Sequence, residues 1–287
     1  MGRGLSHFPY SLLSSGDCHR TLSSVYYTYD YRHWGKAIGF HDSAASLSFF
    51  AIPILVAFGL RFLSWQQLLL ILGIASLLFP IYFWKVSVEP KKEMPWSEGH
   101  YVDLFKKKKI WIMGLLWVFA AGSCLGIYSI LPLYLIKERG IELHFANTLF
   151  GVSRFAGIFI SILIGFLTDR YGYRRMLTVS LLATGLSTIC LSAASTLPLI
   201  LITLLLQATF SLAFFPVGLV AISKFTSLSE RSMGTGVVLS MGVIFGMGST
   251  PLVLGVIADH FSFKVGILGL GVLTTLSSFA VRLLEEK

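Results

Sequence analysis

A short charged hairpin lies between two long apolar runs of the sequence: Gly165-Phe-Leu-Thr-Asp169-Arg170-Tyr-Gly172-Tyr-Arg174-Arg175. Gly165 has no side chain and so allows the end of the first run to approach a neighbouring helix closely. Gly172 predicts a tight turn, after which two arginines open the second run. The hairpin thus joins two hydrophobic segments and carries charge only where they turn.

The composition of the whole chain indicates a membrane protein. Of its 287 residues, 55% are hydrophobic and 13% are charged, and the mean hydropathy is +0.76. A soluble domain carries about 25% charged residues. The formal net charge is +9, but the basic residues lie in loops between apolar runs. Basic residues in such loops set the membrane topology of a protein and do not indicate that it binds phosphate groups. We therefore expect the lipid bilayer, and no nucleic acid, as a partner.

The apolar runs after residue 34 are each long enough to cross about 30 Å of hydrocarbon. Each must form a helix, because backbone groups in lipid have no water to bond. The sequence predicts eight such helices, at roughly 37–60, 64–84, 110–136, 143–167, 176–196, 197–223, 234–258 and 264–284.

Basic residues are distributed unequally over the loops of this layout. When the loops are numbered alternately, 17 basic residues fall on one side and only Arg61, Lys137, Arg139 and Lys264 on the other. The positive-inside rule places the richer side in the cytoplasm. We expect a multi-pass protein of the cell membrane (plasma or inner), with both chain ends in the cytoplasm.

Four segments follow from this layout: an atypical polar N-terminal segment 1–34, two helices within 35–84, a basic linker 85–109 and six helices within 110–287. The linker reads as a solvated tether between bundles. Pro53 precedes Trp65 by the same spacing by which Pro251 precedes Phe263, so the first two helices resemble a degenerate copy of the last two. Such internal repeats build the central site of many secondary transporters. The first half of the repeat is then incomplete.

The pattern Gly-xxx-Asp-Arg-x-Gly-x-Arg-Arg resembles the cytoplasmic loop motif of the major facilitator superfamily, in which it joins the second and third helices of each six-helix half. Tyr173 departs from the basic residue usual at its position. Gly35-Lys-Ala-Ile-Gly39-Phe-His41 is similar to the start of the family's fifth helix, and Leu131-Pro-Leu-Tyr134 to the end of its seventh. The resemblance identifies an apparently N-terminally truncated member that holds helices five to twelve.

The resemblance implies an all-α polytopic membrane protein with a major facilitator-type helix bundle, made of one six-helix half and two helices of the other. It implies a secondary active transporter that carries a small solute by alternating access, with proton-coupled efflux as the favoured mode and a monomer as the favoured state. The alternative is a truncated, non-transporting membrane protein that serves as a scaffold or sensor or is the product of a disrupted gene. We expect no enzymatic activity, because paired carboxylates and histidine clusters are missing from the membrane surface. No cofactor or metal is expected either, since neither a P-loop nor metal-ligand spacing occurs.

The hairpin is the candidate gate. Asp169 is expected to face the start of the helix near Gly234, whose positive end favours a carboxylate by about 0.3–1 kcal/mol. Glu230 is expected to meet Arg170 or Arg174. Together with Gly165, Gly172 and Arg175, this network would hold the cytoplasmic side shut in the outward-open state. A loop staple needed only for membrane insertion is the competing interpretation.

Ionisable groups inside a span cost about 2.5–3.5 kcal/mol on insertion scales and usually face the bundle interior. Arg154 is expected to line the cavity and to meet an anionic group of the substrate or a carboxylate of the other half; an interhelical salt bridge without a substrate role is the equal alternative. His41 and Asp42 are candidates for carrying a coupled proton, since His titrates near neutral pH; side chains that snorkel to the interface are the alternative. The remaining candidate cavity contacts are Tyr128, Tyr134 and Gln207. Gly242, Gly246 and Gly248 are expected to permit a rocking contact between bundles.

Overall fold

The computed structural model describes residues 34–86, 99–227 and 230–284, and within these ranges the chain is helical with no strand. Among the described residues, eight helical stretches are long and apolar enough to cross a membrane. The prediction of eight spanning helices is therefore confirmed. Their bounds are Trp34–Val56, Trp65–Lys85, Lys108–Lys137, Thr148–Tyr171, Tyr173–Ala193, Leu197–Phe225, Arg231–His260 and Phe263–Leu284.

Several of these spans are interrupted, so that the helical elements outnumber the spans. In chain order they are α2 (Trp34–Gly59), α3 (Trp65–Val86), α4 (Gly99–Lys106), α5 (Lys108–Ala121), η3 (Gly122–Gly126), α6 (Ile127–Lys137), α7 (Leu143–Ser153), α8 (Phe155–Tyr171), α9 (Tyr173–Ala193), α10 (Leu197–Phe225), α11 (Arg231–Met241), η4 (Gly242–Gly248), α12 (Ser249–His260), α13 (Phe263–Ala280) and η5 (Val281–Leu284).

The described chain divides into two compact units. The smaller one contains the last turn of α2, a tight turn and α3. Ser64 and Gln67 form a capping box at the start of α3: the Ser64 amide donates to Gln67 Oε1 (2.9 Å) and the Gln67 amide to Ser64 Oγ (3.3 Å). This satisfies two backbone donors that a helix start leaves open. The apolar side chains of α3 are exposed all round, as expected of a span that lies in lipid or against other helices.

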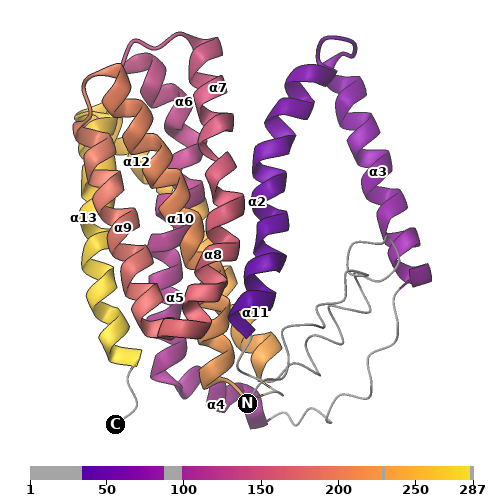
Figure 1. Ribbon diagram of the computed structural model, residues 1–287, viewed down its shortest axis with the longest axis vertical. Helices are drawn as coiled ribbons and strands as arrows, with labels where there is room; N and C mark the ends of the chain where they lie inside the picture. Colours follow the sequence, from indigo (N-terminus) through magenta and orange to yellow (C-terminus); the bar gives the residue numbers. More distant parts are fainter. Residues whose placement is uncertain (1–33, 87–98, 228–229, 285–287) are drawn as a thin grey trace, which may run out of the picture. The chain divides into compact units, whose positions relative to one another are not determined.

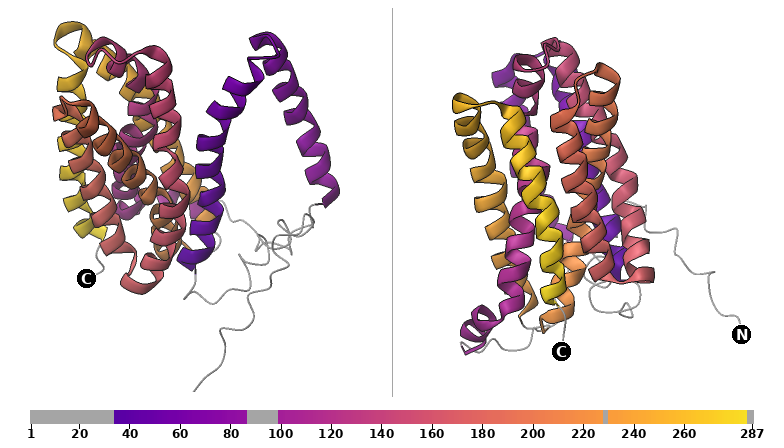
Figure 2. Two further views of the ribbon diagram at one scale, coloured as in Figure 1. Left: turned by 45° about the horizontal axis from the view of Figure 1, so that its top comes forward. Right: turned by 90° about the vertical axis from the view of Figure 1, so that its left-hand side faces the viewer.

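The larger unit contains residues 33–54 and 95–287. Helices α5 to α13 form one bundle in it (Figures 1 and 2). The first turn of α2 lies beside the end of α8. Helix α9 packs on both α10 and α13, and α10 also packs on α8. Two clusters of buried apolar side chains form the core, one centred on Leu116, Leu177 and Phe214 and the other on Leu131 and Leu191. The fold thereby buries the interior of the bundle and leaves its outer apolar surface for lipid.

The predicted linker 85–109 differs from a simple tether where the structure describes it. Residues 87–98 lie outside the described residues, as do residues 1–33 of the polar N-terminal segment. Residues 99–106 form α4, whose Leu104 is only 1% exposed and belongs to the core of the bundle. The end of the linker is therefore packed onto the larger unit, because its one inward-facing leucine finds an apolar site there.

Two spans contain a π-helical segment, and these segments, η3 and η4, pack against each other. A Cβ atom added to Gly246 would lie 2.9 Å from Ala121 Cβ and 3.1 Å from the Gly122 nitrogen. One added to Gly242 would contact Trp117 at 3.3 Å. The expectation that Gly242 and Gly246 form a contact between bundles is wrong, because these glycines permit close packing inside one bundle.

Candidate functional site

The Asp169 carboxylate lies at the last turn of α8 and holds the first turn of α2. Its Oδ1 accepts a hydrogen bond of 2.7 Å from the Gly35 amide, and its Oδ2 accepts one of 3.0 Å from the Lys36 amide. The first amides of a helix have no intrahelical acceptor and carry the positive end of the helix dipole. Asp169 therefore caps α2 from outside, through two charge-assisted hydrogen bonds. We call this pair of contacts the Asp169 clamp.

The predicted partner of Asp169, the helix start near Gly234, is wrong. Two helices begin near a glycine at this end of the larger unit, and the sequence alone does not select between them. In the structure Gly234 is buried, and a Cβ added there would contact Thr226, Ile110 and Leu104. The start of α11 is thus already enclosed by its own bundle, and the start of α2 is the one that reaches Asp169.

Three glycines bring α2 and α8 close enough for the clamp to form. A Cβ added to Gly35 would lie 2.6 Å from the Gly165 carbonyl oxygen, and one added to Gly39 would lie 2.6 Å from the Ser161 carbonyl oxygen. Both atoms belong to the backbone of α8 and cannot move aside easily. Further along, Ser46 Oγ and Ser161 Oγ share a buried hydrogen bond of 3.0 Å. The predicted role of Gly165 in close approach fits this contact.

The turn glycine and the arginines of the hairpin have other roles. Gly172 has a φ of 86°, a backbone angle that residues with a side chain rarely adopt, and it makes the turn between α8 and α9. Arg174 donates to the Leu284 carbonyl oxygen (3.1 Å) and so ties the start of α9 to the end of η5. Arg170 and Arg175 are exposed, and the Arg170 guanidinium lies 5.3 Å from the Tyr171 ring centre.

Glu230 pairs with Lys107, so its expected contact with Arg170 or Arg174 is wrong. Lys107 Nζ donates to Glu230 Oε2 at 2.6 Å, and the Ser227 amide and hydroxyl donate to the same oxygen at 3.1 Å and 2.7 Å. These hydrogen bonds, that of Lys107 foremost, lower the pKa of Glu230 to about 2. The expected pairing of Glu230 fails because α4 packs against the bundle and places Lys107, which follows it, next to this carboxylate.

Arg154 is buried at a break in its span. It separates α7 from α8 and is 2% exposed. Its guanidinium lies 3.3 Å from the Tyr128 ring centre and 5.5 Å from that of Phe49 on α2. It donates to Sγ and to the carbonyl oxygen of Cys124, both at 3.3 Å. None of the ion pairs found among the described residues includes Arg154, so a permanently charged group is buried here on aromatic faces and a neutral carbonyl.

The π-helical segment η3 supplies backbone acceptors to two buried side chains. Cys124 and Ser123 both lie in η3. The Cys124 carbonyl oxygen accepts a hydrogen bond from the Arg154 guanidinium, and the Ser123 carbonyl oxygen accepts one of 2.6 Å from Gln207 Nε2. A π-helical turn changes the backbone hydrogen-bond pattern and is frequent at functional sites. The apolar run does not predict this segment, and the signal that the sequence offers for it is the pair Gly122 and Gly126.

Gln207 and the two tyrosines occupy different parts of the bundle. Gln207 is fully buried, and its Oε1 has no hydrogen-bond partner within the described ranges. Tyr128 adjoins Arg154 and shares a 2.8 Å hydrogen bond with Ser153. The Tyr134 hydroxyl instead accepts a hydrogen bond of 2.6 Å from the Arg139 guanidinium. It donates one of 3.2 Å to the Leu191 carbonyl oxygen. Tyr128 therefore belongs to the Arg154 site, whereas Tyr134 joins α6 to α9 at the other end of the bundle.

His41 and Asp42 are neighbours in the early turns of α2. His41 Nδ1 lies 3.6 Å from Asp42 Oδ1, and the side chains are 57% and 15% exposed. The second carboxylate oxygen of Asp42 is buried, with no hydrogen-bond partner in the described part of the chain. Asp42 is one helical turn from Ser46 and so shares the face of α2 that meets α8.

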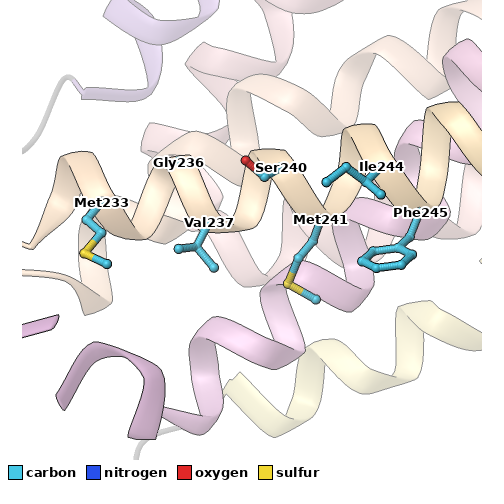
Figure 3. Close-up of a pocket in the computed structure, with 7 residues that line it drawn as sticks. All are labelled: Met233, Gly236, Val237, Ser240, Met241, Ile244 and Phe245. Atoms are coloured by element: carbon cyan, nitrogen blue, oxygen red, sulfur yellow. The ribbon is translucent and has the colours of Figure 1, made fainter. Parts of the chain in front are cut away.

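An apolar groove runs along one side of α11 and η4 (Figure 3). Its volume is about 450 Å³, and it is lined by Met233, Gly236, Val237, Ser240, Met241, Ile244 and Phe245. Met233, Val237 and Met241 point to the same side of the helix in Figure 3. All lining residues come from one continuous span, so this groove is an open face of the bundle and encloses nothing. Across the described ranges, no three His, Cys, Asp or Glu side chains gather as a metal site.

The comparison with known families agrees with the helical bundle. The chain matches the profile of the Major Facilitator Superfamily over residues 23–160 and 126–287. The chain therefore belongs to the Major Facilitator Superfamily, and it is a multi-pass membrane protein of a family of transporters. No curated protein has a sequence that matches it significantly.

Proposed function

We propose that this protein is a secondary active carrier that moves a small solute across the cell membrane by alternating access, in exchange for protons and in the direction of efflux. The observation that carries the proposal is the Asp169 clamp, which joins the starting amides of α2 to the end of α8. If α2 belongs to the N-terminal bundle, as the sequence predicts, the clamp is a contact between bundles at one end of the molecule. Its closing and opening is the motion that alternating access needs.

The orientation of the protein follows from charge. Within the larger unit, α4, the turn between α8 and α9, and the end of α13 lie at the same end (Figure 1). This end carries Lys106 to Lys109, Arg174 and Arg282, so the positive-inside rule supports a cytoplasmic location. The clamp is then a cytoplasmic gate, and both chain ends are cytoplasmic.

We assign solute recognition to the Arg154 site. A guanidinium that is buried without a carboxylate partner among the described residues attracts an anionic group, which can be part of a solute. Tyr128 supplies an aromatic face beside it. His41 and Asp42, on the neighbouring helix, are the groups that we assign to the coupled proton. Gln207 offers a buried acceptor within the same bundle.

The experiment is solute-driven proton movement in proteoliposomes. The full chain is reconstituted with pyranine, a pH-sensitive dye, inside the vesicles, and benzoate, succinate and tetraphenylphosphonium are added outside under an imposed pH gradient. We expect at least one of these solutes to move protons through the wild-type protein and to do so at a different rate after Asp169→Asn. If folded wild-type protein moves no protons with any solute, or if Asp169→Asn leaves the rate unchanged, the carrier proposal is contradicted and the non-transporting alternative gains support.

A further inference from the structure

A second cavity lies at the cytoplasmic end that we propose, apart from the Asp169 clamp and the Arg154 site. It has a volume of about 570 Å³ and is lined by Lys107, Lys108, Lys109, Lys224, Phe225, Thr226 and Ser227. The first three residues lie at the start of α5, and the others at the end of α10 and just after it. We call it the lysine cavity. Two segments that are more than a hundred residues apart in the chain thus build one concave surface.

The lining of the lysine cavity is strongly basic. Among the described residues that line it, four are lysines and none is acidic. Glu230 is not among the lining residues, and its carboxylate accepts hydrogen bonds from Lys107 and from the amide and hydroxyl of Ser227. These bonds fix the loop after α10 against the start of α5. Lys108 and Lys109 lie in the first turn of α5, where the helix dipole also favours an anion.

The lysine cavity lies at the level where two spans meet the membrane boundary. One span begins at Lys108 and the other ends at Phe225. Phe225 is half-buried and packs against the apolar core, so the lining has an apolar side as well as a basic side. Lysine side chains at such positions bury their stems and keep their amines at the headgroup level. This combination fits an amphiphilic anion better than a freely dissolved one.

We propose that the lysine cavity binds a phosphate group, namely that of an anionic phospholipid headgroup in the cytoplasmic leaflet. Basic pockets between transmembrane helices on this side are suited to such headgroups. Lysine amines bind phosphate oxygens as flexible point charges, without the planar geometry that an arginine would impose. A bound headgroup would bridge α5 and α10 and so reinforce the Glu230 contact beside it.

The test is lipid retention by the full chain, purified in detergent and measured by native mass spectrometry with added phosphatidylglycerol or phosphatidylcholine. The informative variant is Lys108→Gln with Lys224→Gln, which leaves Lys107 and its bond to Glu230 in place. The matched control is Lys137→Gln with Lys264→Gln, which removes the same charge from exposed positions at the other end of the bundle. A charge-conserving pair, Lys108→Arg with Lys224→Arg, checks that any loss is electrostatic and that the variants still fold.

We expect the wild type, the control and the arginine pair to retain phosphatidylglycerol in preference to phosphatidylcholine. The glutamine pair should retain phosphatidylglycerol at least about tenfold less, since each basic residue near an anionic surface contributes to the affinity. A parallel measurement of the melting temperature with inorganic phosphate distinguishes the source of the phosphate group. Stabilisation of the wild type by inorganic phosphate, lost in the glutamine pair, would support a soluble phosphate as the ligand; no stabilisation supports the lipid. Equal phosphatidylglycerol retention by wild type and glutamine pair, or an equal loss in the control, would overturn the proposal.

Discussion

The Asp169 carboxylate meets the Gly35 amide at 2.7 Å, although the two residues are 134 positions apart in the chain. The contact joins the end of one span to the beginning of another, and it uses backbone donors that no other residue of α2 can satisfy. A carboxylate bonded to helix-starting amides can release them without leaving a buried, unpaired charge, because Asp169 is only half-buried. This makes the pair suited to a contact that forms and breaks.

The glycines beneath the clamp should matter for stability as well as for motion. We predict that Gly39→Ala destabilises the packing of α2 on α8 by about 1–3 kcal/mol, the usual cost of an overpacked site. The added methyl group would lie 2.6 Å from the Ser161 carbonyl oxygen. The measurement is the melting temperature of the purified protein. Gly255→Ala is the control, because it also lies in a helix and its added Cβ meets no atom within 4 Å; this variant should be neutral or more stable. Equal melting temperatures for both variants would contradict the close approach.

Arg154→Gln should separate solute recognition from structural support. Because Arg154 has no carboxylate partner among the described residues, its removal should keep the melting temperature or raise it. Solute-driven proton movement should be lost. Tyr128→Phe is the matched control: it keeps the ring under the guanidinium and removes only the hydrogen bond to Ser153, at a cost of about 1 kcal/mol, so transport should persist. A lower melting temperature of Arg154→Gln with unchanged apparent affinity for the solute would favour a purely structural role for Arg154.

Much of the fold could be predicted from the sequence, because in lipid each apolar run of sufficient length must be a helix. The hairpin from Gly165 to Arg175 also identified the family, and Gly172 makes the predicted turn. The interruptions were not predictable in the same way. The π-helical segments and the break at Arg154 are local changes of hydrogen bonding within otherwise uniform apolar runs, and they depend on tertiary contacts.

The candidate site was predicted less well than the fold. The sequence predicts that Asp169 caps a helix, but it does not select the partner helix, since both α2 and α11 begin near a glycine at the same end. The cation that pairs with Glu230 is not predicted for a similar reason: charge in the sequence indicates that a partner is needed, but not which one. The position of its partner Lys107 is set by α4, and the polar composition of the linker does not predict this helix.

The Glu230–Lys107 pair predicts a defined pH dependence. The pKa of Glu230 is lowered from 4.5 to about 2, so its stabilising effect is fully present above pH 4.5 and is lost as the pH falls through about 2. Glu230→Gln should therefore lower the stability by the same amount at about pH 6 and about pH 8, roughly 1 kcal/mol after screening at the partly exposed Lys107. Below pH 4.5 the difference from the wild type should shrink.

Melting temperatures in detergent over this pH range provide the measurement. Asp103→Asn is the control, because Asp103 pairs with Lys106 at 3.1 Å while both side chains are largely exposed; it should have little effect at any pH. A loss for Glu230→Gln that changes between about pH 6 and about pH 8 would show that another group titrates at this contact.

The central claim is that the Asp169 clamp closes the cytoplasmic side, and the most direct measurement is the access of water to the surface beneath it. Ser161 is 1% exposed and faces Ser46 across the interface of α2 and α8. In protein with Cys18→Ser, Cys124→Ser and Cys190→Ser, a single Ser161→Cys would be labelled in membranes with a water-soluble maleimide added at the cytoplasmic side. We predict slow labelling when Asp169 is present, markedly faster labelling after Asp169→Asn, and no acceleration after Arg170→Gln, which removes a neighbouring exposed charge. Equal labelling rates with and without Asp169→Asn would contradict this claim.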